Sequence, residues 1–135
     1  MRKDIIENFY TNIVDKDYDG ILAVKFVNKK TEYTFVVISC YLPPEYSKWG
    51  RDNTSFFNHL IMLLYRFDSD MTIIAGDVNS RIGNMIDCTG IESVPSRQIL
   101  EETKNQHGNA FIEFLREVNC CILNGRFDIS RNAYT

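Results

Sequence analysis

The stretch 73–83 holds the residues best suited to chemistry. It reads Ile-Ile-Ala-Gly-Asp-Val-Asn-Ser-Arg-Ile-Gly, so an apolar run leads directly into Asp77 and Asn79. Side chains two positions apart on an extended chain point the same way, so these two can converge on one small target. Gly76, just before them, lets another group approach the backbone closely.

Phosphoester hydrolysis is the chemistry that suits this pair. The carboxylate of Asp77 can accept a proton from an attacking water or orient it. The amide of Asn79 cannot ionise, but it can donate hydrogen bonds to a phosphate. Because a lone carboxylate repels a phosphate, a divalent cation must normally stand opposite. The competing interpretation is that Asp and Asn only form the turn after a strand.

Apolar patterns predict strands around this segment. Residues 21–27 alternate like a strand, the polar residues 28–32 form a hairpin loop, and 33–42 are apolar on both faces. The last run therefore predicts a central strand covered on both sides. Residues 72–75 predict a further strand, and 120–124 a last short buried one.

Two stretches have helical spacing. Asp52, Asn53 or Thr54 can cap the first helix, whose apolar positions follow at Phe56, Leu60, Leu63, Leu64 and Phe67. Asn109 can cap the second, with Phe111, Phe114, Leu115 and Val118 on one side. Strands that alternate with helices indicate an α/β sandwich with helices packed on sheet faces. Residues 1–19 are expected to be a poorly packed lead-in to a domain that spans 20–135.

Composition narrows the class of protein. The chain has 135 residues, 44% of them hydrophobic, which suits one modest domain with a core. Its net charge of −3 argues against holding DNA by charge alone. The four cysteines lack zinc-site spacing and are expected to be buried free thiols of a reducing compartment. No apolar run approaches the roughly 18 residues of a membrane span, and the first residues lack the apolar core of a signal peptide.

Residues 76–83 resemble the Gly-Asp-Phe-Asn-Ala-Arg-Ile-Gly motif of the endonuclease/exonuclease/phosphatase superfamily. The chain looks most like the endonuclease-like domains of non-LTR retrotransposons and reverse-transcriptase-like proteins. Residues 37–44 resemble the family's strand that ends in Tyr-x-Pro, and 105–115 its Asn-x-x-Gly helix start. Residues 121–126 and 133–135 resemble the strands that follow, so the likeness runs from 20 to 135.

The resemblance implies a two-sheet α/β sandwich of the deoxyribonuclease-I-like type and Mg²⁺-dependent hydrolysis of nucleic-acid phosphodiester bonds. DNA is the expected partner, and the nucleus or cytoplasm of a cell the expected location. By position, Asp77 resembles the aspartate that activates the attacking water, and Asn79 the asparagine that contacts the phosphate. Tyr41 resembles the active-site tyrosine, and Thr135 a hydroxyl residue that touches the nucleic acid.

Trp49 and Arg81 are further candidates for nucleic-acid contact. An aromatic side chain at Trp49 could stack on a base, although anchoring its own loop is the alternative. The guanidinium of Arg81 could contact a phosphate, and ordinary surface charge is the alternative for it.

The metal-binding glutamate and the terminal Asp-His pair of the family have no counterpart in this chain, so the metal ligand stays unassigned. We therefore expect a central fragment of a nuclease-like domain that is weak or inactive in this form. A phosphatase for small phosphate esters and a non-catalytic α/β interaction module remain the alternatives.

Overall fold

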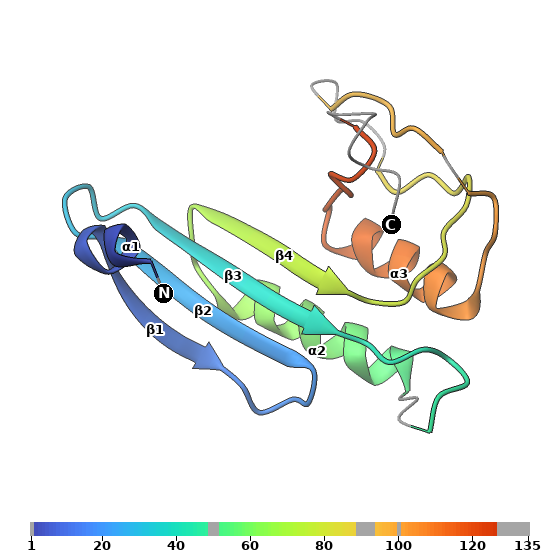
Figure 1. Ribbon diagram of the computed structural model, residues 1–135, viewed down its shortest axis with the longest axis horizontal. Coiled ribbons are helices and arrows are strands. Elements are labelled where there is room, and N and C mark those ends of the chain that lie inside the picture. The colour runs from blue at the N-terminus through green and yellow to red at the C-terminus, as the bar shows by residue number, and fades with distance from the viewer. Residues whose placement is uncertain (1, 49–51, 89–93, 100, 127–135) are drawn as a thin grey trace. The chain divides into compact units, whose positions relative to one another are not determined.

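The computed structural model describes residues 2–48, 52–88, 94–99 and 101–126, which form two compact units. The first unit comprises residues 1–51 and 62–78, and the second 52–61 and 79–135. In chain order the elements are α1 (Lys3–Asn8), β1 (Phe9–Asp15), β2 (Ile21–Asn28), β3 (Thr34–Tyr41), α2 (Asn53–Arg66), β4 (Met71–Asp77) and α3 (Gln106–Glu117). Helix α2 runs from the second unit into the first. The fold class is α/β, as predicted (Figure 1).

A four-stranded mixed sheet forms most of the first unit. Its order is β1-β2-β3-β4, with antiparallel pairing of β1 with β2 and of β2 with β3, and parallel pairing of β3 with β4. The strands predicted over 21–27, 33–42 and 72–75 are thereby confirmed to within two residues at each end. The parallel pair brings the carboxyl ends of β3 and β4 to the same edge of the sheet.

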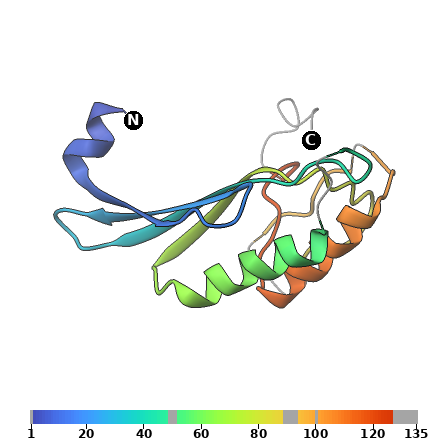
Figure 2. The same ribbon diagram turned by 90° about the horizontal axis from the view of Figure 1, so that it is seen from below.

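One face of this sheet is covered. Ala23, Val36 and Ile38 have no exposed surface, and their register places them side by side on the same face. The second half of α2, which belongs to the same unit and buries Leu63, lies along that face (Figure 2). Burial of β-branched and aliphatic side chains against a helix is what holds this layer together.

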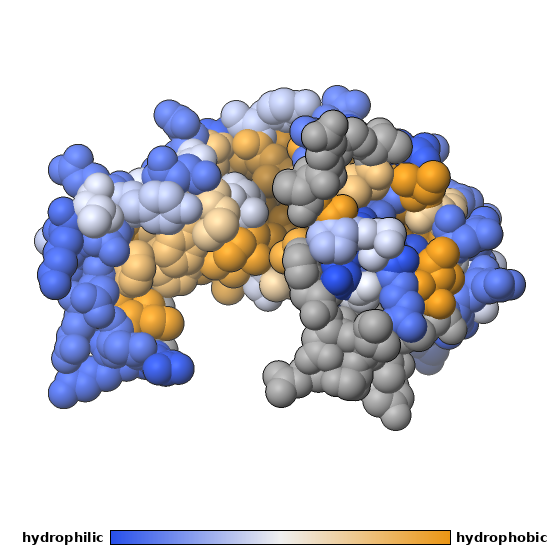
Figure 3. All heavy atoms as spheres, turned by 90° about the horizontal axis from the view of Figure 1, so that it is seen from above, coloured by the Kyte–Doolittle hydropathy of each residue, from blue (hydrophilic) through white to orange (hydrophobic). Residues whose placement is uncertain are grey.

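The opposite face of the sheet is apolar but largely uncovered by the residues that the structure describes. Ile13, Leu22 and Ile73 are 56%, 39% and 40% exposed, and they belong to this face by register. In the space-filling view, hydrophobic residues gather over the strands, whereas α1 and the turn between β2 and β3 are hydrophilic (Figure 3). Strand β3 lies inside the sheet, as predicted, and the described residues cover one of its two faces.

Part of the expected lead-in is regular structure. Phe9–Asp15 form β1, the edge strand of the sheet, and Phe9 packs edge-on against Phe35, with ring centroids 5.4 Å apart. Phe35 in turn stacks on Phe26 of β2 at 4.7 Å. The apolar pattern did not predict this strand, because most of its side chains face solvent and charged residues lie on both sides of it. Helix α1, before it, buries no residue.

The second unit is built around α3 and the first half of α2. The ring of Phe57 stacks on Phe111 and Phe114, with centroids 5.8 and 5.4 Å away. Asp52 caps α2, as one of the predicted alternatives: its carboxylate accepts the Thr54 N–H at 3.0 Å and the Ser55 hydroxyl at 2.8 Å. Both hydrogen bonds stabilise the charged form, so the pKa of Asp52 is below its usual range.

Two predictions in the second unit are wrong. Helix α3 begins at Gln106 with Asn105 as its cap, not at Asn109, which lies within the first turn. Residues 120–124 form no strand, and Leu123 is 60% exposed. The backbone N–H of Ile122 donates to the Asp87 carboxylate at 2.8 Å instead of to a neighbouring strand. In the described part of the chain, no helix is long and apolar enough to cross a membrane.

Truncating a side chain should destabilise the protein more on the covered face of the sheet than on the open face. Ile38→Ala should lower the free energy of unfolding by about 2–5 kcal/mol, because it leaves a cavity at a fully buried site. Ile73→Ala, in the neighbouring strand but on the open face, should cost about 1 kcal/mol. Urea unfolding of both variants measures the difference, and equal losses would contradict the assignment of the faces.

Candidate functional site

Asp77 and Tyr41 lie next to each other at the carboxyl ends of β4 and β3. They are register partners in the parallel pair, and the Leu42 N–H donates to the Asp77 carbonyl at 2.9 Å. Directly paired residues of neighbouring strands point to the same face of a sheet. Both side chains are exposed, Tyr41 by 52%. A carboxylate and a phenol are therefore presented together to solvent.

Gly76 explains how the two strands come so close at this point. Its φ of +149° is one that residues with a side chain rarely adopt, and a Cβ there would lie 1.8 Å from the Cys40 carbonyl oxygen. The group that approaches the backbone of Gly76 is thus the neighbouring strand β3. The glycine of the motif sets the strand pairing that aligns Tyr41 with Asp77.

The Asp77 carboxylate also acts on its surroundings electrostatically. Burial raises the pKa of the Cys40 thiol to about 11, and the negative charge of Asp77 adds to this shift. Cys40 is 5% exposed and lies one residue before Tyr41. The thiol therefore stays protonated at neutral pH.

The backbone leaves the extended conformation before Asn79. Strand β4 ends at Asp77, and Asn79 has a φ of +46°, in the left-handed region that Asn tolerates better than most residues. The extended geometry that would point Asn79 and Asp77 the same way is therefore absent. The spacing argument for their convergence no longer holds, and the role of Asn79 rests on the resemblance.

Asn105 fixes the loop that contains Asn79 and Arg81. Within the second unit its Nδ2 donates to the Asn79 carbonyl at 2.9 Å, and its Oδ1 accepts the Arg81 N–H at 2.9 Å. The same Oδ1 caps α3 by accepting the Gly108 N–H at 2.7 Å. One side chain thus satisfies three backbone groups and joins the loop to the start of the helix.

Gly108 makes this junction possible because a Cβ there would lie 2.0 Å from the Arg81 carbonyl oxygen. The capping pattern points to Asn109 rather than Asn105, because Asn109 is a second capping residue just before the apolar positions. The Asn-x-x-Gly spacing of 105–108 is the sequence signal that locates the cap.

Of the three remaining candidates for nucleic-acid contact, the structure describes Arg81 alone. The Arg81 guanidinium pairs with Glu101 at 3.1 Å, and both side chains are about half exposed, so the pair stabilises little and leaves the charge in solvent. Trp49 and Thr135 lie outside the described residues.

Among the described residues, no three His, Cys, Asp or Glu side chains are grouped closely enough to hold a metal ion. Asp15, at the carboxyl end of β1, is buried to 7% exposure, but it pairs with Ala23 on the covered face. Asp77 lies on the opposite face of the same sheet, so Asp15 does not join it.

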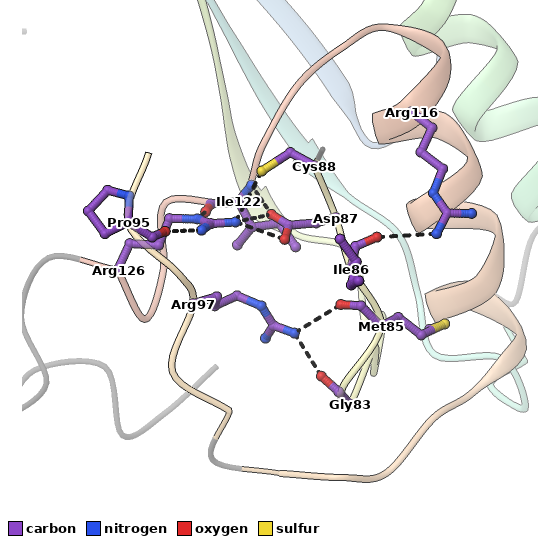
Figure 4. Close-up of polar contacts among 10 residues, drawn as sticks. All are labelled: Gly83, Met85, Ile86, Asp87, Cys88, Pro95, Arg97, Arg116, Ile122 and Arg126. Atoms are coloured by element: carbon purple, nitrogen blue, oxygen red, sulfur yellow. Dashed lines mark hydrogen bonds and ion pairs between the residues drawn. The ribbon is translucent and has the colours of Figure 1, made fainter. Parts of the chain in front are cut away.

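A buried ion pair in the second unit had no sequence signal. Arg126 Nη2 lies 2.8 Å from Asp87 Oδ1, with side chains only 4% and 5% exposed (Figure 4). Burial alone would raise the pKa of Asp87, but hydrogen bonds from Arg126 and from the Ile122 N–H outweigh it and leave the pKa below its usual range. Arg126 also donates to the carbonyls of Ile122 and Pro95, so its side chain links the segments that contain residues 87, 95 and 122.

Comparison of the chain with models of protein families, with curated proteins and with solved structures gives no match.

Removing the side chain that joins the loop to α3 should cost stability. Asn105→Ala should lower the free energy of unfolding by about 2–3 kcal/mol, because the helix loses its cap and two loop groups lose their partners. Asn109→Ala, an exposed position in the first turn of the same helix, is the matched control and should be within about 0.5 kcal/mol of the parent. Similar losses for the two variants would contradict the assignment of the cap.

The buried ion pair should give stability a defined dependence on pH. Asp87→Asn should cost about 3–5 kcal/mol at pH 7, because it leaves the Arg126 charge buried without its partner. The pKa of Asp87 is lowered in the folded state, so its contribution is complete above its unfolded pKa of about 3.9 and is lost progressively as the pH falls from there through the folded pKa. Urea unfolding from pH 7 to pH 3 should show a difference between the two proteins that is constant down to about pH 4 and begins to shrink toward pH 3. A difference that stays constant over the whole range would refute this account, and exposed Asp68→Asn serves as the control.

Proposed function

We propose that this chain is part of a phosphodiesterase domain of the endonuclease type, which hydrolyses phosphodiester bonds in nucleic acid, most favourably DNA. The observation that carries the proposal is the register pair of Asp77 and Tyr41, exposed side by side at the carboxyl ends of two parallel strands. In open α/β sheets this is the edge at which ligands bind. The Gly-Asp-x-Asn motif ends the same strand.

The roles follow from the chemistry of the two groups. The carboxylate of Asp77 accepts the proton of the attacking water, and the Tyr41 phenol donates a hydrogen bond to a phosphate oxygen. Asn79 follows two residues later and binds the phosphate in this proposal, a role that rests on the resemblance. Arg81 is proposed to contact a phosphate through its half-exposed guanidinium, with Glu101 as its competing partner.

Mg²⁺ is the cation that we propose to accompany the phosphate. This ion keeps several waters and binds through one or two carboxylates together with the phosphate oxygens of its substrate. Since Asp77 is one carboxylate, the described residues supply no complete ligand set, and no step of the reaction is assigned to the metal. We accordingly expect weak activity from this chain.

We further propose a two-sheet sandwich of the deoxyribonuclease-I-like type as the complete fold. The support is the uncovered apolar face of the sheet, on which Ile13, Leu22 and Ile73 lie. A second sheet packed there would bury these side chains at the usual spacing of about 10 Å. The intracellular location, in nucleus or cytoplasm, belongs to the same proposal.

Hydrolysis of model esters tests the function. With Mg²⁺ in excess, the chain should nick supercoiled plasmid slowly and cleave bis(p-nitrophenyl) phosphate in preference to p-nitrophenyl phosphate. Asp77→Asn should reduce both diester activities about a hundredfold or to background, because the proton acceptor is lost. Tyr41→Phe should reduce them about tenfold, because it removes one hydrogen bond to the phosphate.

The controls lie at the other ends of the same strands. Asp68→Asn, just before β4, and Tyr33→Phe, just before β3, should retain the activity of the parent chain. A preference for the monoester would favour the phosphatase alternative. Cleavage of neither ester, together with unchanged Tyr41 and Asp77 NMR signals when a short DNA duplex and Mg²⁺ are added, would overturn both enzymes and favour the non-catalytic interaction module.

A further inference from the structure

The buried Asp87–Arg126 pair places two cysteines from distant parts of the sequence next to each other. Asp87 precedes Cys88, and the Ile122 N–H, which donates to Asp87 at 2.8 Å, follows Cys121. Arg126 Nη2, which binds the Asp87 carboxylate, also donates to Cys88 Sγ at 3.3 Å (Figure 4). The ion pair therefore fixes the backbone on both sides of this pair of thiols.

The two thiols interact directly. Burial first, and then the neighbouring Cys88, raise the pKa of the Cys121 thiol, which places Cys121 beside Cys88. Cys88 Sγ itself accepts a hydrogen bond from the Arg126 guanidinium at 3.3 Å. A cationic donor next to a sulfur is the usual environment of a nucleophilic cysteine. Both residues are half-buried and so within reach of a small oxidant.

We propose that Cys88 and Cys121 are a redox modification site, which peroxide converts into a reversible disulfide. Cys88 is the sulfur that peroxide oxidises, and Cys121 is the resolving thiol. The inference does not rest on the proposed nuclease function, because it involves neither Asp77 nor Tyr41. Redox-sensing thiols in reducing compartments are commonly pairs of this kind.

The chemistry balances with hydrogen peroxide as the oxidant. The sulfur of Cys88 attacks one peroxide oxygen, the O–O bond breaks, and the departing hydroxide takes up the thiol proton as water. This leaves Cys88 as a sulfenic acid. The sulfur of Cys121 then attacks the Cys88 sulfur, an S–S bond forms, and the sulfenic hydroxyl leaves with the Cys121 proton as a second water. Two thiols are oxidised by two electrons and one peroxide is reduced.

The other cysteines do not share this arrangement. Cys40 is 5% exposed, and burial raises its pKa to about 11, so it should react slowly. Burial also raises the pKa of Cys120, and its sequence neighbour Cys121 adds to the shift. Cys120 competes with Cys88 as the partner of Cys121 in a disulfide, so the experiment must distinguish the two bonds.

Peptide mapping after mild peroxide treatment tests the site. The full chain should lose two free thiols, and the mass of one linked peptide pair should fall by two hydrogen atoms, with Cys88 joined to Cys121. Dithiothreitol should restore both thiols. In Cys121→Ser, oxidation should stop at a sulfenic acid on Cys88 that dimedone traps. In Cys88→Ser, oxidation of Cys121 should slow by about tenfold or more.

Cys120→Ser is the matched control and should form the Cys88–Cys121 bond at the rate of the parent chain. Circular dichroism of each serine variant confirms that it is folded before the thiols are counted. A bond between Cys120 and Cys121, a bond between two chains, or persistence of both thiols would overturn the proposal.

Discussion

The close pairing of β3 with β4 at Cys40 and Gly76 is the constraint on which the candidate site depends. Any side chain at position 76 would collide with the Cys40 carbonyl, so the residue must be glycine for the strands to remain in register. One residue further on, that register sets Tyr41 beside Asp77. A shift of one position would turn one of the two side chains to the covered face. The chemistry proposed for this edge therefore depends on a backbone contact that carries no functional group.

In the second unit, Asn105 has a comparable structural role. Its amide side chain binds the backbone of the loop that contains Asn79 and also caps α3. The Asn-x-x-Gly segment and the Gly-Asp-x-Asn segment each contribute a residue whose main task is structural. These two motif residues keep the backbone in place. Asp77 and Tyr41, in contrast, present their side chains next to each other because the strand register pairs them.

Periodicity was sufficient to predict most of the elements, because strands 21–28 and 34–41 and helix 53–66 bury regular patterns of apolar side chains. It failed at β1, whose side chains mostly face solvent, and at 120–124, where the backbone N–H of Ile122 donates to the Asp87 carboxylate. The choice of cap for α3 needed the position of Arg81, which is distant in sequence. Asp77 was predicted from its place after an apolar run and Tyr41 from the resemblance, but their shared register could not be derived from local patterns. Asp87, Cys88, Cys121 and Arg126 come together only in three dimensions, and no spacing rule would have joined them.

The central claim is that Asp77 and Tyr41 together face a phosphodiester. Titration of the isotopically labelled chain with a short DNA duplex in Mg²⁺, followed residue by residue by NMR, tests it most directly. The account predicts concentration-dependent shifts of the Tyr41 and Asp77 amide signals, weakened in Asp77→Asn and unchanged in Asp68→Asn. Shifts confined to the other end of the sheet, near Tyr33 and Asp68, or no shifts at all, would contradict it.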